Sequence, residues 1–327
     1  MADIFYDKQC DLSSLENLTL AVVGYGNQGR AHALNLKDSG LNVITGTRAG
    51  SKSCQQAKDD GMPFFEIPEA AARADLIAVL LPDEQMPRVV SKEILPNAKK
   101  GTAFVFAHGF AVHHKTISLP TDSDIILVAP TGPGRQLRSL YQEGLGLPAL
   151  IAVEQDASGM AWQRCLSYAH GIGATRAGAI KTSFQEETVT DLFCEQAVLC
   201  GGLPELIKAS FDTLVSQGYQ SELAYISCLK EVKLIADLLF QQGIDGMRAA
   251  ISNTAKYGSA LAGPQIINSN TREQLARVLK RIETGDFAKD FIEDSSHGNP
   301  TIKELMKTER HSRIAKVGRE LKENLIF

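Results

Sequence analysis

Residues 18–29 read Leu-Thr-Leu-Ala-Val-Val-Gly-Tyr-Gly-Asn-Gln-Gly, a short apolar run that ends in a glycine-rich turn. The following residues, 30–40, have the composition of a helix. A GxGxxG motif between a strand and a helix is typical of dinucleotide binding, because its glycines let backbone N–H groups approach a pyrophosphate at the helix N-terminus. An ordinary strand-to-helix turn is the alternative interpretation. The candidate cofactor-binding residues here are Gly24, Tyr25, Gly26, Asn27, Gln28 and Gly29.

The first half of the chain alternates short apolar runs with helical stretches, and several runs are apolar without alternation. Strands that are buried on both faces have this pattern, and they belong to a parallel sheet covered by helices. We therefore predict a doubly wound α/β domain of the Rossmann type. The predicted strands are Leu18–Val23, Leu41–Thr45, Asp75–Leu81, Thr102–Ala107, Asp124–Ala129 and Ala149–Val153.

The second half has a different pattern. Apolar residues recur at three- and four-residue spacing over Gln185–Gly202, Glu222–Gln242 and Thr271–Thr284, which predicts helices. We expect a dinucleotide-binding domain over residues 1–181 and an all-helical domain over residues 182–327.

Composition excludes several classes of protein. The 327 residues contain 34 Lys and Arg against 38 Asp and Glu, a formal charge of −4, so nothing indicates a nucleic acid or an anionic membrane as partner. No apolar run approaches the roughly 18 residues of a membrane span, and no secretion signal is visible at the N-terminus. Six scattered cysteines without a CxxC pair indicate free thiols in a reducing compartment. We expect a cytoplasmic enzyme.

The end of the second predicted strand discriminates between cofactors. An NAD site usually has an acidic residue there for the ribose 2′-OH, whereas this strand continues into Arg48, followed by Ser51 and Ser53. An arginine with hydroxyl donors suits a 2′-phosphate, which favours NADP(H) over NAD(H). A solvated basic turn is the alternative, and NAD(H) use stays open.

Carboxylates dominate the candidate chemistry of the second half. Glu187, Asp191 and Glu195 lie four residues apart and share one face if the segment is helical, and Glu231 lies one turn after Ser227. Oxygen ligands without His or Cys neighbours suggest Mg²⁺. Such spacing alone is more typical of a solvated helix face, but the apolar surroundings favour a buried cluster neutralised by metal.

His108 follows a predicted strand at the carboxyl end of the sheet, where ligands bind in such folds, and a structural role is the alternative. The loop of residues 129–134, Ala-Pro-Thr-Gly-Pro-Gly, follows the next strand. This loop either shapes a pocket or is a simple turn.

With these motifs in order, the sequence resembles short-form ketol-acid reductoisomerases over nearly its whole length. The matching stretches are GYGNQGRAHALNL, TRAGSKS, LLPDEQ, FAHGF, AP-GPG, EET-TDLF-EQ-VLCGG, E-KLI-DL and ISNTA-YG. The resemblance implies a Rossmann domain, a knotted helical domain and a homodimer, or a larger homo-oligomer, with active sites at the subunit interface. It also implies NADPH and two Mg²⁺, used to rearrange 2-acetolactate and then reduce the product to a 2,3-dihydroxy acid.

The resemblance also implies roles for individual residues. Asp191 and Glu195 correspond to ligands of the first metal, and Glu231 to a second-metal ligand donated by the partner subunit. Ser252 corresponds to the hydroxyl that holds the substrate carboxylate, and His108 to a catalytic residue near the nicotinamide. The remaining cofactor positions, in the LLPDEQ stretch, are Leu81, Pro82, Asp83 and Gln85.

The departures from the family pattern lie at positions that carry the chemistry. In the substrate region Thr131 replaces the active-site Lys of the family loop APKGPGH, Arg135 replaces its His, and Ser227 replaces a metal-binding Glu. A divalent ion held by few carboxylates loses affinity with each one removed, and an alkyl shift depends on metal polarisation more than hydride transfer does. Further replacements are Lys230 for His, Val189 and Lys181 for Glu, and Cys194 for Gly.

Three functions follow as hypotheses. We favour a remodelled oxidoreductase of specialised metabolism, similar to a relative that closes a cyclopropanol ring from a sulfonium-bearing hydroxy acid. A housekeeping reductoisomerase of valine and isoleucine synthesis is the alternative that overall similarity supports. A non-catalytic NADP(H)-binding relative is a third, opposed by the retention of Asp191, Glu195, Glu231 and Ser252.

Overall fold

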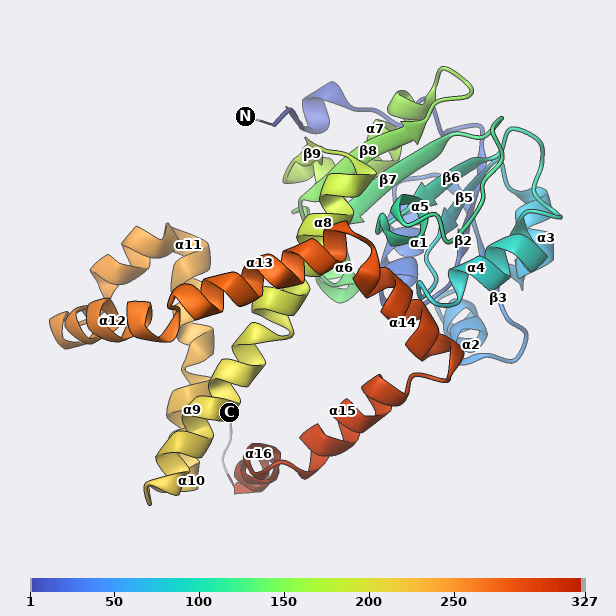
Figure 1. The fold of residues 1–327 in the computed structure, drawn as a ribbon. Helices are drawn as coiled ribbons and strands as arrows, with labels where there is room; N and C mark the ends of the chain where they lie inside the picture. Colours follow the sequence, from blue (N-terminus) through green and yellow to red (C-terminus); the bar gives the residue numbers. More distant parts are fainter. Residues whose placement is uncertain (1, 325–327) are drawn as a thin grey trace. The chain divides into compact units, whose positions relative to one another are not determined.

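The computed structural model describes residues 2–324, and the chain divides into two compact units, one up to Thr188 and one from Val189 onward. The first unit is built on a nine-stranded sheet in the order β1-β9-β8-β7-β6-β5-β2-β3-β4 (Figure 1). Its strands are β1 Ile4–Phe5, β2 Thr19–Val23, β3 Asn42–Thr47, β4 Phe64–Glu66, β5 Leu76–Val79, β6 Ala103–Phe106, β7 Ile125–Pro130, β8 Ala149–Gln155 and β9 Ala179–Lys181.

All six predicted strands are confirmed, and the doubly wound class is correct for the central part of the sheet. Strands β4, β3, β2, β5, β6 and β7 are parallel, whereas β8 pairs antiparallel with β7 and β1 pairs antiparallel with β9. The predicted Rossmann fold with a doubly wound parallel sheet is therefore confirmed, with antiparallel pairs at this edge. The alternation of strands and helices in a sequence does not reveal whether two neighbouring strands run parallel or antiparallel.

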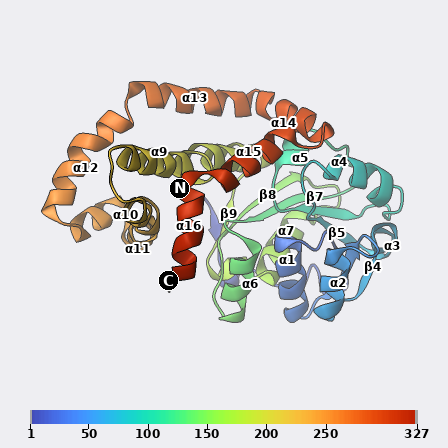
Figure 2. The ribbon, with the colours of Figure 1, turned by 90° about the horizontal axis from the view of Figure 1, so that it is seen from below.

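Apolar side chains fill both faces of the sheet. Along β2, Leu20 and Val22 belong to one core cluster and Ala21 and Val23 to the other. Helices α1, α6 and α7 cover the first face, and α3, α4 and α5 cover the second (Figure 2). The helices of this unit are α1 Asn27–Asp38, α2 Lys52–Asp59, α3 Ile67–Arg73, α4 Met86–Val89, α5 Phe110–His113, α6 Gly134–Gln142 and α7 Ala161–Gly171.

Helix α8, Phe184–Cys194, spans the division between the units and continues into a π-helical turn, Glu195–Leu199. The described part of the second unit contains only helices, as the periodicity predicted. A further π-helical turn, Ile226–Lys230, precedes α11. The helices are α9 Gly202–Ser216, α10 Ser221–Tyr225, α11 Val232–Ala250, α12 Asn253–Ile266, α13 Ser269–Glu283, α14 Asp286–Ser296, α15 Pro300–His311 and α16 Arg313–Asn324.

The core of the second unit is small. It consists of residues of α9, α10 and α16, among them Phe211, Tyr225 and Val317, whereas α11 and α12 bury no residue. Large apolar side chains on these two helices are exposed, with Phe240 at 89% and Tyr257 at 72%. None of the described helices is both long enough and apolar enough to cross a lipid bilayer.

Candidate active site

The glycine loop lies at the carboxyl end of β2, and its backbone is packed too closely for larger residues. Gly24 has a φ of +96°, and a Cβ added to Gly29 would lie 1.9 Å from the Gly24 carbonyl oxygen. A Cβ at Gly26, in contrast, would meet no protein atom within 4 Å. The loop thus forms a tight turn with one side left open, which fits a pyrophosphate that approaches the first turn of α1.

Side-chain contacts hold this loop in place. The Tyr25 hydroxyl donates to an Asp60 carboxylate oxygen at 3.0 Å, and Arg30 binds both oxygens of the same carboxylate. Burial and the hydrogen bond to Asp60 raise the pKa of Tyr25, while the Arg30 guanidinium keeps the pKa of Asp60 low. On the other side of the loop, the Gln28 amide donates to the Gly132 carbonyl oxygen at 2.8 Å. The loop is therefore preorganised for its ligand.

A groove of two adjoining cavities follows the carboxyl ends of β3, β2, β5 and β6. The first cavity, of about 210 Å³, is lined by the glycine loop, Arg48, Ser51, Ser53 and Gln85, with no carboxylate among its lining residues. The second, of about 290 Å³, shares Gly26 and residues 80–82 with the first and extends to Asn27, Gln28, Asp83 and His108. The sheet order reverses between β2 and β5, the position where open α/β sheets bind ligands.

The polar end of the first cavity suits a phosphate. Ser51 caps helix α2, and its hydroxyl oxygen accepts from the Cys54 N–H at 3.1 Å. The positive end of this helix, the exposed Arg48 and the Ser53 side chain therefore border the same cavity. These are the residues that the sequence singled out for the 2′-phosphate.

His108 has a buried partner that the sequence-based site did not include. Its Nδ1 lies 3.0 Å from one carboxylate oxygen of Glu187, and the other oxygen accepts from the Gly109 N–H at 2.7 Å. Glu187 is 3% exposed. A carboxylate oxygen is the acceptor in this contact, so the hydrogen bond places a proton on Nδ1 and leaves Nε2 for acid–base chemistry. Glu187 appeared in the sequence only as one member of an acidic series, 79 residues after His108.

The aromatic surroundings of His108 are also defined. Its ring stacks on Phe110, and Phe110 packs edge-on against His114. Burial lowers the pKa of His114, and the neighbouring His113 and His108 lower it further. A positive charge on His114, close to His108, is therefore disfavoured near neutral pH.

The acidic face of α8 differs from its predicted form. Glu187, Asp191 and Glu195 do follow one another at one-turn intervals, but Asp191 and Glu195 are exposed and only Glu187 is buried. The expectation of a buried cluster is therefore wrong for two of the three residues within this chain. Glu187 is instead compensated by His108 and a backbone N–H.

The second group of candidate residues lies elsewhere in the helical unit. Ser227 is in the π-helical turn before α11, Glu231 is exposed at the start of that helix, and the Ser252 hydroxyl oxygen caps α12 by accepting from the Ala255 N–H. Within residues 189–324, no three side chains of metal-ligand type bring their ligand atoms together.

Thr131, in the loop after β7, and Arg135, in the first turn of α6, do not line the groove. The Thr131 hydroxyl donates to the Pro148 carbonyl oxygen at 3.0 Å, and Thr131 lines neither cavity of the groove. Arg135 lines a separate cavity together with Arg30 and Arg138. Thr131 supplies no positive charge in place of the family's active-site lysine, and Arg135 does not border the groove.

The fold and the groove together define a dinucleotide-binding protein. Residues 14–178 match the family described as acetohydroxy acid isomeroreductase, NADPH-binding domain, and residues 184–326 match ketol-acid reductoisomerase, C-terminal domain. An NADH-preferring ketol-acid reductoisomerase from an uncultured archaeon is 42% identical, with a TM-score of 0.95 over 99% of this chain and 100% of that one. The chain belongs to the ketol-acid reductoisomerase family and is an NAD(P)-dependent oxidoreductase.

More distant structures share only the fold. A semialdehyde dehydrogenase NAD-binding protein from Cupriavidus necator is 18% identical, with a TM-score of 0.62 over 81% of this chain and 99% of that one. A pyrroline-5-carboxylate reductase from Coxiella burnetii is 14% identical, with a TM-score of 0.54 over 81% and 96% of the two chains.

Proposed function

We propose that this protein is a Mg²⁺- and NADP(H)-dependent oxidoreductase of a small hydroxy or keto acid in which reduction is retained and alkyl migration is weakened. When bound, the nicotinamide exchanges a hydride with the substrate and the metal polarises its oxygens. The observation that carries this proposal is made at the loop after β7 and the start of α6, where the Thr131 hydroxyl is bonded to a backbone carbonyl and Arg135 lines another cavity. Neither residue thus places a positive charge beside the groove.

The decisive experiment follows NADPH oxidation with Mg²⁺ and two substrates, 2-acetolactate and the already rearranged 3-hydroxy-3-methyl-2-oxobutanoate. We expect turnover of the second to exceed that of the first by at least about 100-fold, since only the first requires migration. Thr131→Lys combined with Ser227→Glu should raise acetolactate turnover at least about tenfold. Equal turnover of both substrates by the unmodified protein would contradict the proposal.

A housekeeping reductoisomerase is the second candidate function. The family match over both halves of the chain and the 42% identity to an enzyme of that name favour it. A role in specialised metabolism, including ring closure of a sulfonium-bearing hydroxy acid, is the narrower form of our first proposal. It becomes the next to test if neither substrate above is turned over.

For the cofactor, we propose NADP(H) in preference to NAD(H). Arg48, Ser51 and Ser53 border one cavity that no carboxylate lines. Arg48→Ala is expected to weaken NADPH binding at least about tenfold and NADH binding less than about twofold, because only NADPH offers a 2′-phosphate to the guanidinium. Fluorescence titration with both cofactors measures the difference. Equal losses would show that this cavity does not discriminate.

For the metal and the assembly, we propose that Asp191 and Glu195 of one subunit and Glu231 of a second hold Mg²⁺, with Ser252 on the substrate carboxylate. Asp191 and Glu195 present exposed oxygen donors one turn apart, a donor type that suits Mg²⁺. The apolar residues exposed on α11 and α12, beside Glu231 and Ser252, favour a second copy as their cover.

Asp191→Asn and Glu231→Gln should each abolish the heat of Mg²⁺ binding in calorimetry, because each removes a charged ligand. Mixing the two variants after reversible dissociation is expected to restore about a quarter of the sites, since random pairing in a two-fold dimer places both intact ligands in that fraction. Each variant measured alone is the control. No recovery on mixing would contradict a shared site, and unchanged binding by Asp191→Asn would remove that residue from it.

A further inference from the structure

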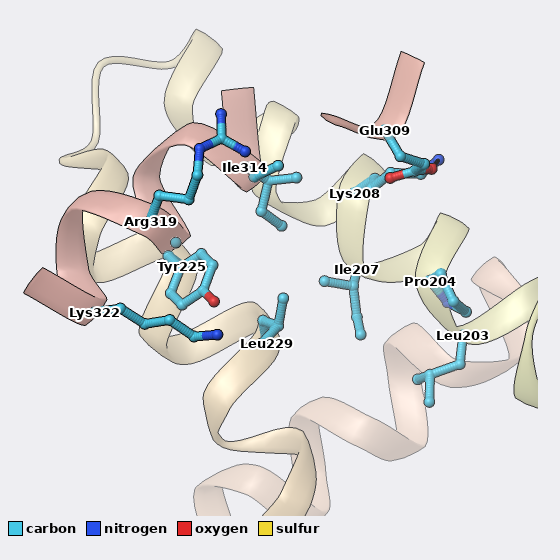
Figure 3. A pocket seen from close by; sticks show the side chains of 12 residues that line it. Leu203, Pro204, Ile207, Lys208, Tyr225, Leu229, Glu309, Ile314, Arg319 and Lys322 are labelled. Atoms are coloured by element: carbon cyan, nitrogen blue, oxygen red, sulfur yellow. Dashed lines mark hydrogen bonds and ion pairs between the residues drawn. The ribbon is translucent and has the colours of Figure 1, made fainter. Parts of the chain in front are cut away.

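The helical unit contains a cavity that none of the proposed cofactor, metal or substrate residues lines. It has a volume of about 400 Å³ and lies between α9, α10, the π-helical turn before α11, the end of α15 and α16 (Figure 3). Its walls are mostly apolar, with Leu203, Ile207, Leu229 and Ile314 among them. Sites for small organic ligands have this size and this apolar lining, with a few polar groups that set orientation.

Some of the positively charged side chains around the cavity are paired with carboxylates and others are not. Lys208 is held between Glu205 and Glu309, so its charge is compensated, and these two carboxylates raise its pKa. Arg319 donates to the Arg310 carbonyl oxygen at 3.1 Å. Among the residues that the structure describes, no carboxylate pairs with Arg319 or Lys322. The α16 side of the cavity therefore carries two uncompensated positive charges.

Tyr225 adds a neutral donor on the same side. Figure 3 shows its hydroxyl and the Lys322 ammonium on one side of the cavity, across from the Lys208–Glu309 pair. The ring is only 8% exposed and packs against α16 at Gly318, where a Cβ would lie 2.8 Å from the Tyr225 hydroxyl oxygen. The glycine thus lets the phenol reach the cavity edge. A hydroxyl, an ammonium and a guanidinium next to an apolar wall are complementary to a carboxylate with a hydrocarbon chain.

We propose that this cavity binds a small carboxylic acid with an apolar chain. The carboxylate lies against Lys322 and Tyr225, with Arg319 as a further positive charge on the α16 side, and the chain covers Ile207 and Leu229. The inference is independent of the proposed reaction, because the site lies entirely within one unit and shares no residue with the groove.

Isothermal titration calorimetry of the full chain with 4-methylpentanoate tests this inference. We expect binding by the unmodified protein and an affinity at least tenfold lower for Arg319→Gln combined with Lys322→Gln. Arg313→Gln combined with Lys316→Gln makes the same change of charge on positions of α16 outside the cavity, and it should leave the affinity unchanged. The neutral 4-methylpentanamide should bind at least tenfold more weakly than the acid.

Several results would overturn the proposal. These are no heat from the unmodified protein, equal losses in both double variants, or equal binding of acid and amide. Loss of binding in Ser252→Ala would assign the probe to the proposed substrate site. If the Arg319/Lys322 variant changes the mass in sedimentation equilibrium, a second copy covers the cavity and the proposal is wrong. The readout is binding and not turnover, so failure here leaves the proposed reaction to its own assay.

Discussion

A Gly26→Ala variant should lose at least about 100-fold in NADPH affinity, about 2.7 kcal/mol, while its melting temperature changes by less than about 2 °C. A methyl group at this position meets no protein atom within 4 Å, and the backbone there has a φ of −85°, outside the left-handed region that favours glycine. The methyl group would instead occupy the open side of the loop, where the pyrophosphate is expected. Fluorescence titration and thermal denaturation measure the two quantities.

Gly29→Ala is the matched contrast. Its methyl group would lie 1.9 Å from the Gly24 carbonyl oxygen, so the turn itself must open, and we expect a loss of at least about 2 kcal/mol in the free energy of unfolding. If Gly26→Ala destabilised the protein as much as Gly29→Ala, its effect on the cofactor could not be assigned to the binding surface.

We expect the second large effect from Glu187→Gln. This variant should lower kcat about 10²- to 10⁴-fold and change the NADPH affinity by less than about threefold. The carboxylate accepts from His108 and from the Gly109 N–H, and it keeps the imidazole proton on Nδ1. A glutamine amide offers a donor as well as an acceptor, so it can present an N–H to Nδ1 and favour the opposite tautomer. The prediction depends on the proposed catalytic role of His108.

Glu186→Gln is the control, because it removes the same charge from an exposed neighbour on α8 whose carboxylate accepts from the Thr182 hydroxyl at 2.8 Å. Steady-state kinetics with either tested substrate compares the two variants. Equal activity of Glu187→Gln and Glu186→Gln would show that the His108 partner does not affect the reaction.

Most of the fold could be predicted because burial determines which residue types a strand contains. Runs such as Ile125–Val128 are apolar throughout since both sheet faces are covered, and they identified the central strands. The two-residue β1 and three-residue β4 and β9 carry too little pattern to be recognised. The antiparallel pairing of β8 with β7 also leaves no trace in composition, because a buried strand looks the same in either direction.

The candidate site was less predictable, since its key contacts join distant parts of the chain. The glycine loop and Arg48 can be recognised from the residues next to them in the sequence, and both border the groove. The pairing of His108 with Glu187 depends on how α8 meets the end of β6, which no local spacing reports. The directions taken by Thr131 and Arg135 likewise follow from the turn after β7, not from their identity.

The small hydrophobic core of the helical unit has a consequence for how the protein folds. Helices α11 and α12 bury none of their own residues, and α11 is broken at Gly243, which has a φ of +71°. These helices bury little apolar surface within one polypeptide, so a second copy that covers them, as we propose, would supply much of their stability. On that proposal their stability depends on protein concentration, and freshly synthesised chains would have to associate before this part becomes resistant to proteases.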